Sequence, residues 1–167
     1  MRLAGFAAGC GAFSAIAMGA QLLLDGASAQ GSGPEKKDGK VVFRHVLDNE
    51  PIEFKYKTDQ TITAAVETFH KTAENPYRGE AEVVADGEKI YARLCVACHL
   101  KDGSGRIGPD LVDDKYGYER TATDKGEFEI IYAGGAGAMQ AFGRRITQDE
   151  ILRVMAYLDE LKAREGG

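Results

Sequence analysis

Hydrophobic and polar positions along the 167-residue chain separate an uncharged leader from a mixed segment and a series of amphipathic helices. The leader has Arg2 near its start and no charged residue from Leu3 to Leu24. It ends with Ala27-Ser28-Ala29. A basic start, an apolar stretch and a small-x-small site predict a secretory signal peptide over residues 1–29, cleaved between Ala29 and Gln30. We therefore expect a periplasmic protein. A retained N-terminal membrane anchor is the alternative, because the apolar run approaches the length of a short span.

Residues 30–79 are expected to form a tail and an N-terminal extension. Residues 30–39 contain Gly, Ser, Pro and Lys without an apolar period, which is typical of a flexible tail. Ile52, Phe54 and Tyr56 alternate with charged residues, which predicts one strand of a short β-hairpin over residues 40–57. Residues 61–71 are predicted to form a short helix, which ends before Asn75-Pro76-Tyr77.

Residues 80–167 are expected to form the main domain, with three further helices. The first runs from Ala81 to His99 and has apolar residues at helical spacing. The second begins with a capping box at Asp124–Glu127 and ends at Gly134-Gly135. The third begins with a Thr147–Glu150 capping box, and its apolar stripe comprises Ile151, Val154, Met155, Leu158 and Leu161. The fold class is therefore predicted to be mainly α.

Composition and charge narrow the possible functions. A chain that is 44% hydrophobic and 28% charged is typical of a globular protein and not of a multi-span membrane protein. The net charge is −5 and stays −5 without the leader, whereas a nucleic-acid binder needs a basic surface. Cleavage also removes Cys10, so the three cysteines of the full chain become two in the mature protein.

Both remaining cysteines belong to Cys95-Val96-Ala97-Cys98-His99, the attachment signature of a c-type haem. Two thiols at this spacing can add to the two vinyl groups of one haem, and His99 then lies beneath the iron as the proximal ligand. Pro109 follows in Gly108-Pro109-Asp110-Leu111. A backbone carbonyl near Pro109 is expected to accept the Nδ1–H of His99 and fix the imidazole ring, with a simple turn proline as the alternative.

Other uses of a Cys-x-x-Cys motif fit the sequence less well. A thioredoxin-like site lies at the start of a helix, where the helix dipole lowers the pKa of a thiol, whereas this motif ends a predicted helix. A zinc site needs further ligands, and the mature chain has no other cysteine. A structural disulfide gains nothing from the adjacent histidine.

The mature chain offers few side chains for the sixth position of the iron. They are His45, His70, Met139 and Met155. Met155 falls on the apolar stripe of the last helix and is interpreted as a core residue, while His45 and His70 are interpreted as surface histidines. Met139 lies in a glycine-flanked loop, from which a flexible thioether can reach the iron. A His99–Met139 pair leaves no position for oxygen or peroxide, which favours electron transfer over catalysis.

These features together resemble a class I cytochrome c over Glu80 to about Arg164. The resemblance includes the haem motif, Gly108-Pro109-x-Leu111, Met139 and the last helix. It implies that the first and last helices of the domain cross where Gly87 meets Tyr157. The expected fold is thus a class I cytochrome c, with an N-terminal extension that packs on the haem core.

A narrower resemblance is to the cytochrome cL family. It rests on Asn75-Pro76-Tyr77, Gly105-Arg106-Ile107-Gly108-Pro109, Tyr116-x-Tyr118, Ile131-Tyr132-Ala133-Gly134-Gly135-Ala136 and Leu152-Arg153-x-Met155-Ala156. The family implies a periplasmic acceptor of electrons from methanol dehydrogenases that use pyrroloquinoline quinone. Partners of the calcium enzymes carry Trp near Tyr116–Tyr118 and in the last helix, whereas this chain has no Trp. That difference favours the XoxG type, which serves lanthanide-dependent enzymes.

The sequence therefore predicts a periplasmic electron carrier with one covalent haem c, and not an enzyme. Its expected donor is a methanol or other alcohol dehydrogenase, and its expected acceptor is another cytochrome c or an oxidase. No nucleic acid and no stable membrane insertion are expected after the leader is removed. The alternatives are a generic respiratory cytochrome c, and an open-site haem enzyme or gas sensor in which Met139 does not bind the iron.

Overall fold

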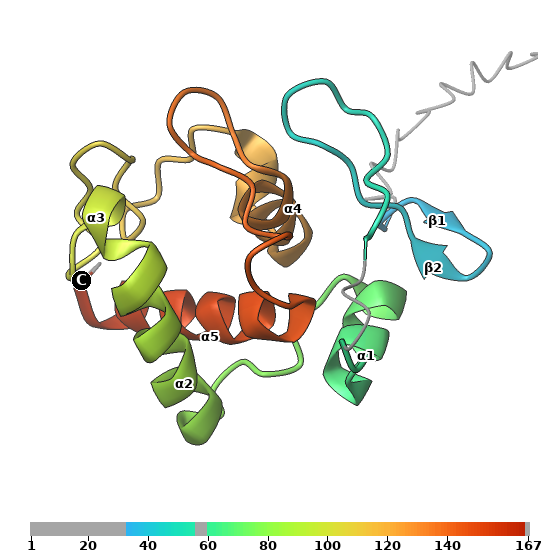
Figure 1. The fold of residues 1–167 in the computed structure, drawn as a ribbon, viewed down its shortest axis with the longest axis horizontal. Helices are drawn as coiled ribbons and strands as arrows, with labels where there is room; N and C mark the ends of the chain where they lie inside the picture. Colours follow the sequence, from blue (N-terminus) through green and yellow to red (C-terminus); the bar gives the residue numbers. More distant parts are fainter. Residues whose placement is uncertain (1–32, 56–59, 166–167) are drawn as a thin grey trace, which may run out of the picture. The chain divides into compact units, whose positions relative to one another are not determined.

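The structure is a computed structural model that describes residues 33–55 and 60–165, all within one compact unit of the chain, Ser32–Gly167. The predicted signal peptide lies outside the described residues. The described elements, in chain order, are β1 (Lys36–Lys37), β2 (Lys40–Val41), α1 (Ala64–Thr72), α2 (Ala81–Leu94), α3 (Val96–His99), the 3₁₀ helix η1 (Glu119–Ala122), α4 (Asp124–Ala133) and α5 (Gln148–Glu165) (Figure 1). The mainly α prediction is confirmed.

Helices α2 and α5 cross at Gly87, where the two backbones touch. A Cβ atom at this position would lie 2.0 Å from the carbonyl oxygen of Arg153 and 2.9 Å from the Cβ of Tyr157. Beside the crossing, the rings of Tyr91 and Tyr157 pack with their centroids 5.2 Å apart. Because only glycine permits this approach, Gly87 sets how closely the two helices pack, as the resemblance implied.

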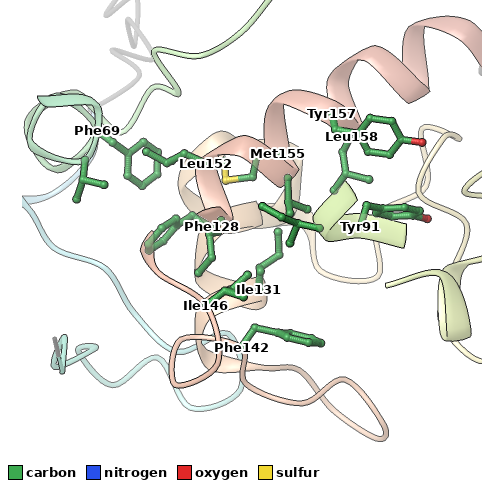
Figure 2. Close-up of a cluster of buried hydrophobic side chains, with 14 of the residues drawn as sticks. Phe69, Tyr91, Phe128, Ile131, Phe142, Ile146, Leu152, Met155, Tyr157 and Leu158 are labelled. Carbon is green, nitrogen blue, oxygen red and sulfur yellow. The ribbon is translucent and has the colours of Figure 1, made fainter. Parts of the chain in front are cut away.

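The hydrophobic core lies where α4 and the α2–α5 pair meet. Figure 2 shows Phe128 of α4 beside Leu152 and Met155 of α5. Phe128 is fully buried, and Ile151, Leu152 and Met155 are 0–1% exposed. The interpretation of Met155 as a core residue is confirmed. The stripe predicted for the last helix is therefore the buried face of α5.

One capping box forms as the sequence predicts, and the other is shifted by one residue. Thr147 and Glu150 exchange both hydrogen bonds, at 2.8 and 3.1 Å, at the start of α5. At α4, however, the cap is Thr123, whose hydroxyl accepts the Gly126 N–H, and Asp124 is already helical. The Asp124 carboxylate instead accepts hydrogen bonds from the Asn75 N–H and from Arg78.

The helix predicted over Ala81–His99 is broken inside the haem motif. α2 ends at Leu94, Cys95 adopts φ −111° and ψ −33°, and α3 carries the rest of the motif. Between α3 and α4 the chain forms the 3₁₀ helix η1. The break changes the direction of the chain at the first cysteine, which periodicity alone does not predict.

The extension contains the expected β-hairpin, but the hairpin lies earlier than the alternating pattern indicates. β1 and β2 pair antiparallel with Lys36 opposite Val41, so the predicted tail supplies one strand. Over residues 40–55 a single bridge joins Arg44 and Pro51. The alternation of apolar and charged residues from Ile52 still predicts burial correctly. Ile52 is buried and Phe54 is half-buried, while their neighbours are exposed. Tyr56 and Lys57 lie outside the described residues.

The extension packs on the core through an aromatic cluster. Phe43 of the extension and Phe69 of α1 lie within 5.4 Å of the Phe128 ring, centroid to centroid. His70 is 8% exposed and its Nε2 lies 2.6 Å from the side-chain oxygen of Gln148 on α5. The interpretation of His70 as a surface residue is therefore wrong: its helix faces α5, and burial lowers the pKa of its imidazole.

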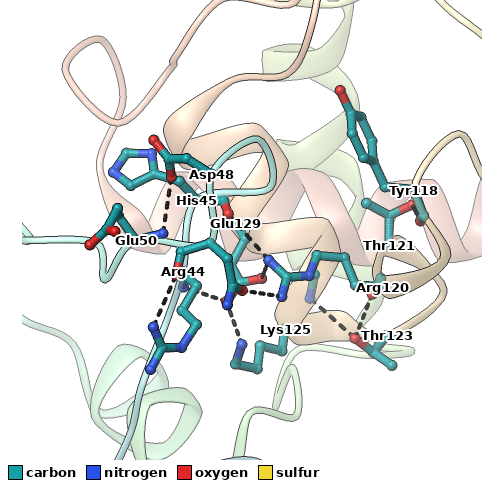
Figure 3. A network of polar contacts seen from close by, with 12 residues as sticks. Arg44, His45, Asp48, Glu50, Tyr118, Arg120, Thr121, Thr123, Lys125 and Glu129 are labelled. Carbon is teal, nitrogen blue, oxygen red and sulfur yellow. Dashed lines mark hydrogen bonds and ion pairs between the residues drawn. The ribbon is translucent and has the colours of Figure 1, made fainter.

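A buried carboxylate also joins the extension to α4 (Figure 3). Glu129 is fully buried, and its Oε1 accepts the backbone N–H of Arg44 at 2.6 Å and a hydrogen bond from Lys125. A guanidinium nitrogen of Arg120 lies 3.7 Å from Oε2, and the same side chain donates to the carbonyl of His45 and to Asn49. Glu129 thus accepts hydrogen bonds from the extension and from α4, and forms an ion pair with Arg120 of η1.

Replacing Glu129 with alanine should destabilise the holoprotein by about 3–5 kcal/mol, because it leaves the Lys125 charge and the Arg44 N–H without their buried acceptor. Guanidinium unfolding measures the change. E160A is the control, since Glu160 is an exposed acid on α5 and its loss should have little effect. Equal losses in the two variants would show that the Glu129 contacts do not hold the extension.

Candidate haem site

A cavity of about 270 Å³ opens between the haem motif, α4 and the loop that follows α4. Its wall includes Cys95, Cys98, His99, Pro109 and Met139, and Ile130 and Ile131 contribute apolar surface from α4. One water needs only about 10–15 Å³, so the space holds far more than a water molecule. An apolar void of this size would cost stability if nothing filled it, which indicates a large apolar ligand.

Both cysteines lie at the cavity wall, and no disulfide joins them. Cys95 and Cys98 are half-buried, and the Cys98 N–H donates to the Cys95 carbonyl at 3.1 Å as α3 begins. Burial raises the pKa of the Cys95 thiol to about 11. Reactive Cys-x-x-Cys pairs have a lowered thiol pKa, so this environment does not activate a redox nucleophile. The environment of Cys95 is instead compatible with a thiol that attaches a ligand covalently.

The His99 ring is fixed by a backbone carbonyl. Nδ1 lies 3.0 Å from the carbonyl oxygen of Pro109, which is the hydrogen bond expected from the sequence. A carbonyl can only accept, so Nδ1 carries a proton, and in the neutral imidazole Nε2 then keeps a lone pair. An imidazole held in this tautomer is prepared to bind a metal through Nε2.

The loop after α3 packs tightly against the same ring. A Cβ atom at Gly108 would lie 2.4 Å from Cε1 of His99, so no larger residue fits there without moving the imidazole. The N–H groups of Arg106, Ile107 and Gly108 all approach the carbonyl of Cys98 at 3.0–3.2 Å. Gly108 belongs to the Gly108-Pro109-x-Leu111 motif, but the structure is needed to show that it leaves room for the imidazole.

Met139 reaches the cavity from a loop that folds back on the end of α4. Gly134 ends that helix with φ +85°, and the Gly135 N–H donates to the Met139 carbonyl at 3.0 Å. Beyond the methionine, the Phe142 N–H returns to the Ile131 carbonyl. The half-buried Met139 side chain therefore shares one cavity with His99. Among the described residues, neither histidine of the extension nor Met155 lines this cavity.

Another part of the wall is fixed by a residue that sequence reasoning missed. The Lys162 ammonium on α5 donates to the carbonyl of Asp113, the hydroxyl of Tyr116 and the carboxylate of Asp114 at 2.8–3.0 Å. An ammonium has three N–H donors, and all three are used. Lys162 therefore ties residues 113–116 to α5.

Comparisons with known proteins agree with this geometry. Residues 82–158 match the family model described as cytochrome C oxidase, cbb3-type, subunit III. Cytochrome c-L from Methylorubrum extorquens is 33% identical over 131 residues, which cover 78% of this chain. The chain spans 65% of the length of that relative.

Two solved structures extend the likeness to the fold. The crystal structure of cytochrome CL from the marine methylotrophic bacterium Methylophaga aminisulfidivorans is 36% identical, with a TM-score of 0.71, over 72% of this chain and 81% of that one. The chain belongs to the cytochrome cL family. Cytochrome cL from Hyphomicrobium denitrificans is 33% identical, with a TM-score of 0.69, over 72% and 73% of the two chains.

Membership of the cytochrome cL family confirms the resemblance found in the sequence and the class of cofactor. The cavity and its two thiols fit one covalently bound haem c, since the wall is largely apolar and offers both an imidazole and a thioether. The relatives compared are named cytochromes cL, which agrees with the electron carrier expected from the sequence. Within residues 33–55 and 60–165, no helix is long and apolar enough to cross a membrane.

Proposed function

We propose that this member of the cytochrome cL family is a periplasmic monohaem carrier of single electrons. Its donor is a methanol dehydrogenase that uses pyrroloquinoline quinone, and its acceptor is another cytochrome c or an oxidase. The observation that carries the proposal is the cavity that brings Cys95, Cys98, His99 and Met139 together. The chain is divided into a signal peptide (1–29), an extension (30–79) and the haem domain (80–167).

Each cavity residue has a distinct role in this proposal. Cys95 and Cys98 form thioethers with the haem, His99 binds the iron through Nε2, and Met139 binds it through sulfur. The Pro109 carbonyl orients the imidazole through the 3.0 Å hydrogen bond at Nδ1. The bound haem supplies a one-electron iron centre, and the protein holds its ligands in both oxidation states.

Ligation by Met139 separates this proposal from an open-site enzyme or gas sensor. The ferric protein should show the weak far-red charge-transfer band of a methionine–iron bond, and the ferrous protein should not bind carbon monoxide. Met139→Ala should lose the band and bind carbon monoxide, because the sixth position becomes open. Met139→His is the matched control, which should lose the band yet still exclude carbon monoxide. Carbon monoxide binding by the unaltered ferrous protein would contradict the ligand assignment.

The family and the missing Trp support a particular partner. The three relatives named above are all cytochromes cL, and one of them comes from a bacterium described as methylotrophic, which supports a role in one-carbon metabolism. At the positions where partners of calcium enzymes have Trp, this chain has Gly117 and Tyr157. Gly117 has open space at its Cβ position, and Tyr157 instead packs against Tyr91. These substitutions support a partner of the lanthanide-dependent type.

Stopped-flow reduction of the purified ferric protein tests the partner. The lanthanide-dependent methanol dehydrogenase should reduce it faster than the calcium enzyme, because the surface around Gly117 lacks the Trp of the calcium partners. A mitochondrial-type cytochrome c, mixed with the same enzymes, is the control for unspecific reduction. Absence of reduction by both enzymes would refute the partner and leave the haem assignment standing.

A further inference from the structure

A carboxylic acid lies in the wall of the haem cavity. Glu127 is on α4, three and four residues before Ile130 and Ile131, so the three side chains share one helix face. All three line the cavity, and the glutamate is half-buried there. An apolar stripe that faces a cofactor has no structural need for a carboxylate.

Glu127 also lacks the partners that buried acids normally have. In the part of the chain that the structure describes, its carboxylate makes no hydrogen bond and no ion pair, whereas Glu129 on the opposite face of α4 has several partners. The two cations near Glu127 are engaged elsewhere. Arg78 pairs with Asp124 and Asp159, and Lys162 binds residues 113–116. Solvent protons are therefore the cations left to neutralise this acid.

Burial and two nearby carboxylates disfavour an ionised Glu127. Burial raises the pKa of its carboxyl to about 8, with Asp159 of α5 and Asp124 of α4 adding to the rise and the cations Arg78 and Lys162 opposing it. The other charged or ionisable groups that line the cavity away from α4 include His99, Asp110, Asp113 and Lys115. A group with this pKa changes its protonation near neutral pH, where a nearby unit charge can decide its state.

We infer that Glu127 is a redox-linked proton site of the haem cavity, which binds a proton when the cofactor gains an electron. Reduction removes one positive charge from the iron centre, so the carboxylate loses a favourable neighbour and takes a proton from solvent onto an Oε atom. One electron and one proton enter together, and both leave on oxidation. The inference rests on the proposed haem site but not on any particular dehydrogenase.

The sign of the pH dependence follows from this linkage. The pKa of Glu127 must be higher in the reduced protein than in the oxidised one, so the reduction potential falls as pH rises between the two values. The slope is at most about 59 mV per pH unit, which corresponds to one proton per electron. Below both pKa values Glu127 is neutral in both states, and above both it is ionised in both states. The potential is therefore flat in those two ranges.

Spectroelectrochemical titration of the holoprotein with chemical mediators, at a series of pH values around 8, tests the inference. The wild-type potential should fall with pH, and Glu127→Gln should remove that fall. Because glutamine resembles the protonated acid, E127Q should match the wild type at low pH and exceed it at high pH. Glu160→Gln, which removes an exposed acid on α5, is the control and should keep the slope.

Two further measurements keep the inference testable if E127Q binds haem poorly. Asp159→Asn should move the sloping range to lower pH, because it removes a negative charge that raises the pKa of Glu127. A redox difference infrared spectrum of the wild type should show a protonated carboxyl band that appears on reduction and shifts in D₂O. A wild-type reduction potential that does not change with pH would overturn the inference. An equal slope in E127Q and the wild type would also overturn it, because the proton would then belong to the haem propionates. Neither outcome depends on electron delivery by the dehydrogenase.

Discussion

The structure depends on filling one apolar cavity that the protein chain leaves open. Helices α2 and α5 touch at Gly87 and diverge from that crossing, and α4 with the Met139 loop encloses the space beyond it. Side chains do not fill this space, so its free energy cost must be offset by a bound apolar group. Covalent attachment at Cys95 and Cys98 offsets this cost permanently, because the protein cannot release a group that is bound through two thioethers.

The same constraint explains why the extension is needed. α4 carries the apolar cavity face on one side and Glu129 on another, so its position decides the shape of the cavity. The extension holds α4 in two ways, through the aromatic cluster around Phe128 and through the Arg44 backbone at Glu129. The polar contacts of Glu129 also offset the desolvation cost of its buried carboxylate, which would otherwise destabilise the fold. The extension is thus a support for the haem domain.

Local signals in the sequence predicted much of this arrangement, and non-local contacts account for the rest. The haem motif and the Thr147–Glu150 box have meanings fixed by a few neighbouring residues, and the structure contains the box as predicted. The helix crossing at Gly87 is what the family resemblance implies, and the structure confirms it. The burial of His70 depends on Gln148, which is 78 residues away in the sequence. At the start of α4, the Asp124 carboxylate accepts a hydrogen bond from the Asn75 N–H, 49 residues away, while Thr123 caps the helix. A local pattern does not contain these partners. Glu127 could not be recognised as a cavity residue, because its charge resembles that of an ordinary first helical turn.

Covalent attachment of one haem through both cysteines is the central claim, and intact-mass analysis of the exported protein tests it most directly. Expression with a c-type maturation system should give the chain beginning at Gln30 plus the mass of one haem, and denaturation should not release it. Cys95→Ala and Cys98→Ala should each retain a single thioether, and the double variant should lose the covalent haem. A folded, exported protein with the mass of the unmodified chain would contradict the account.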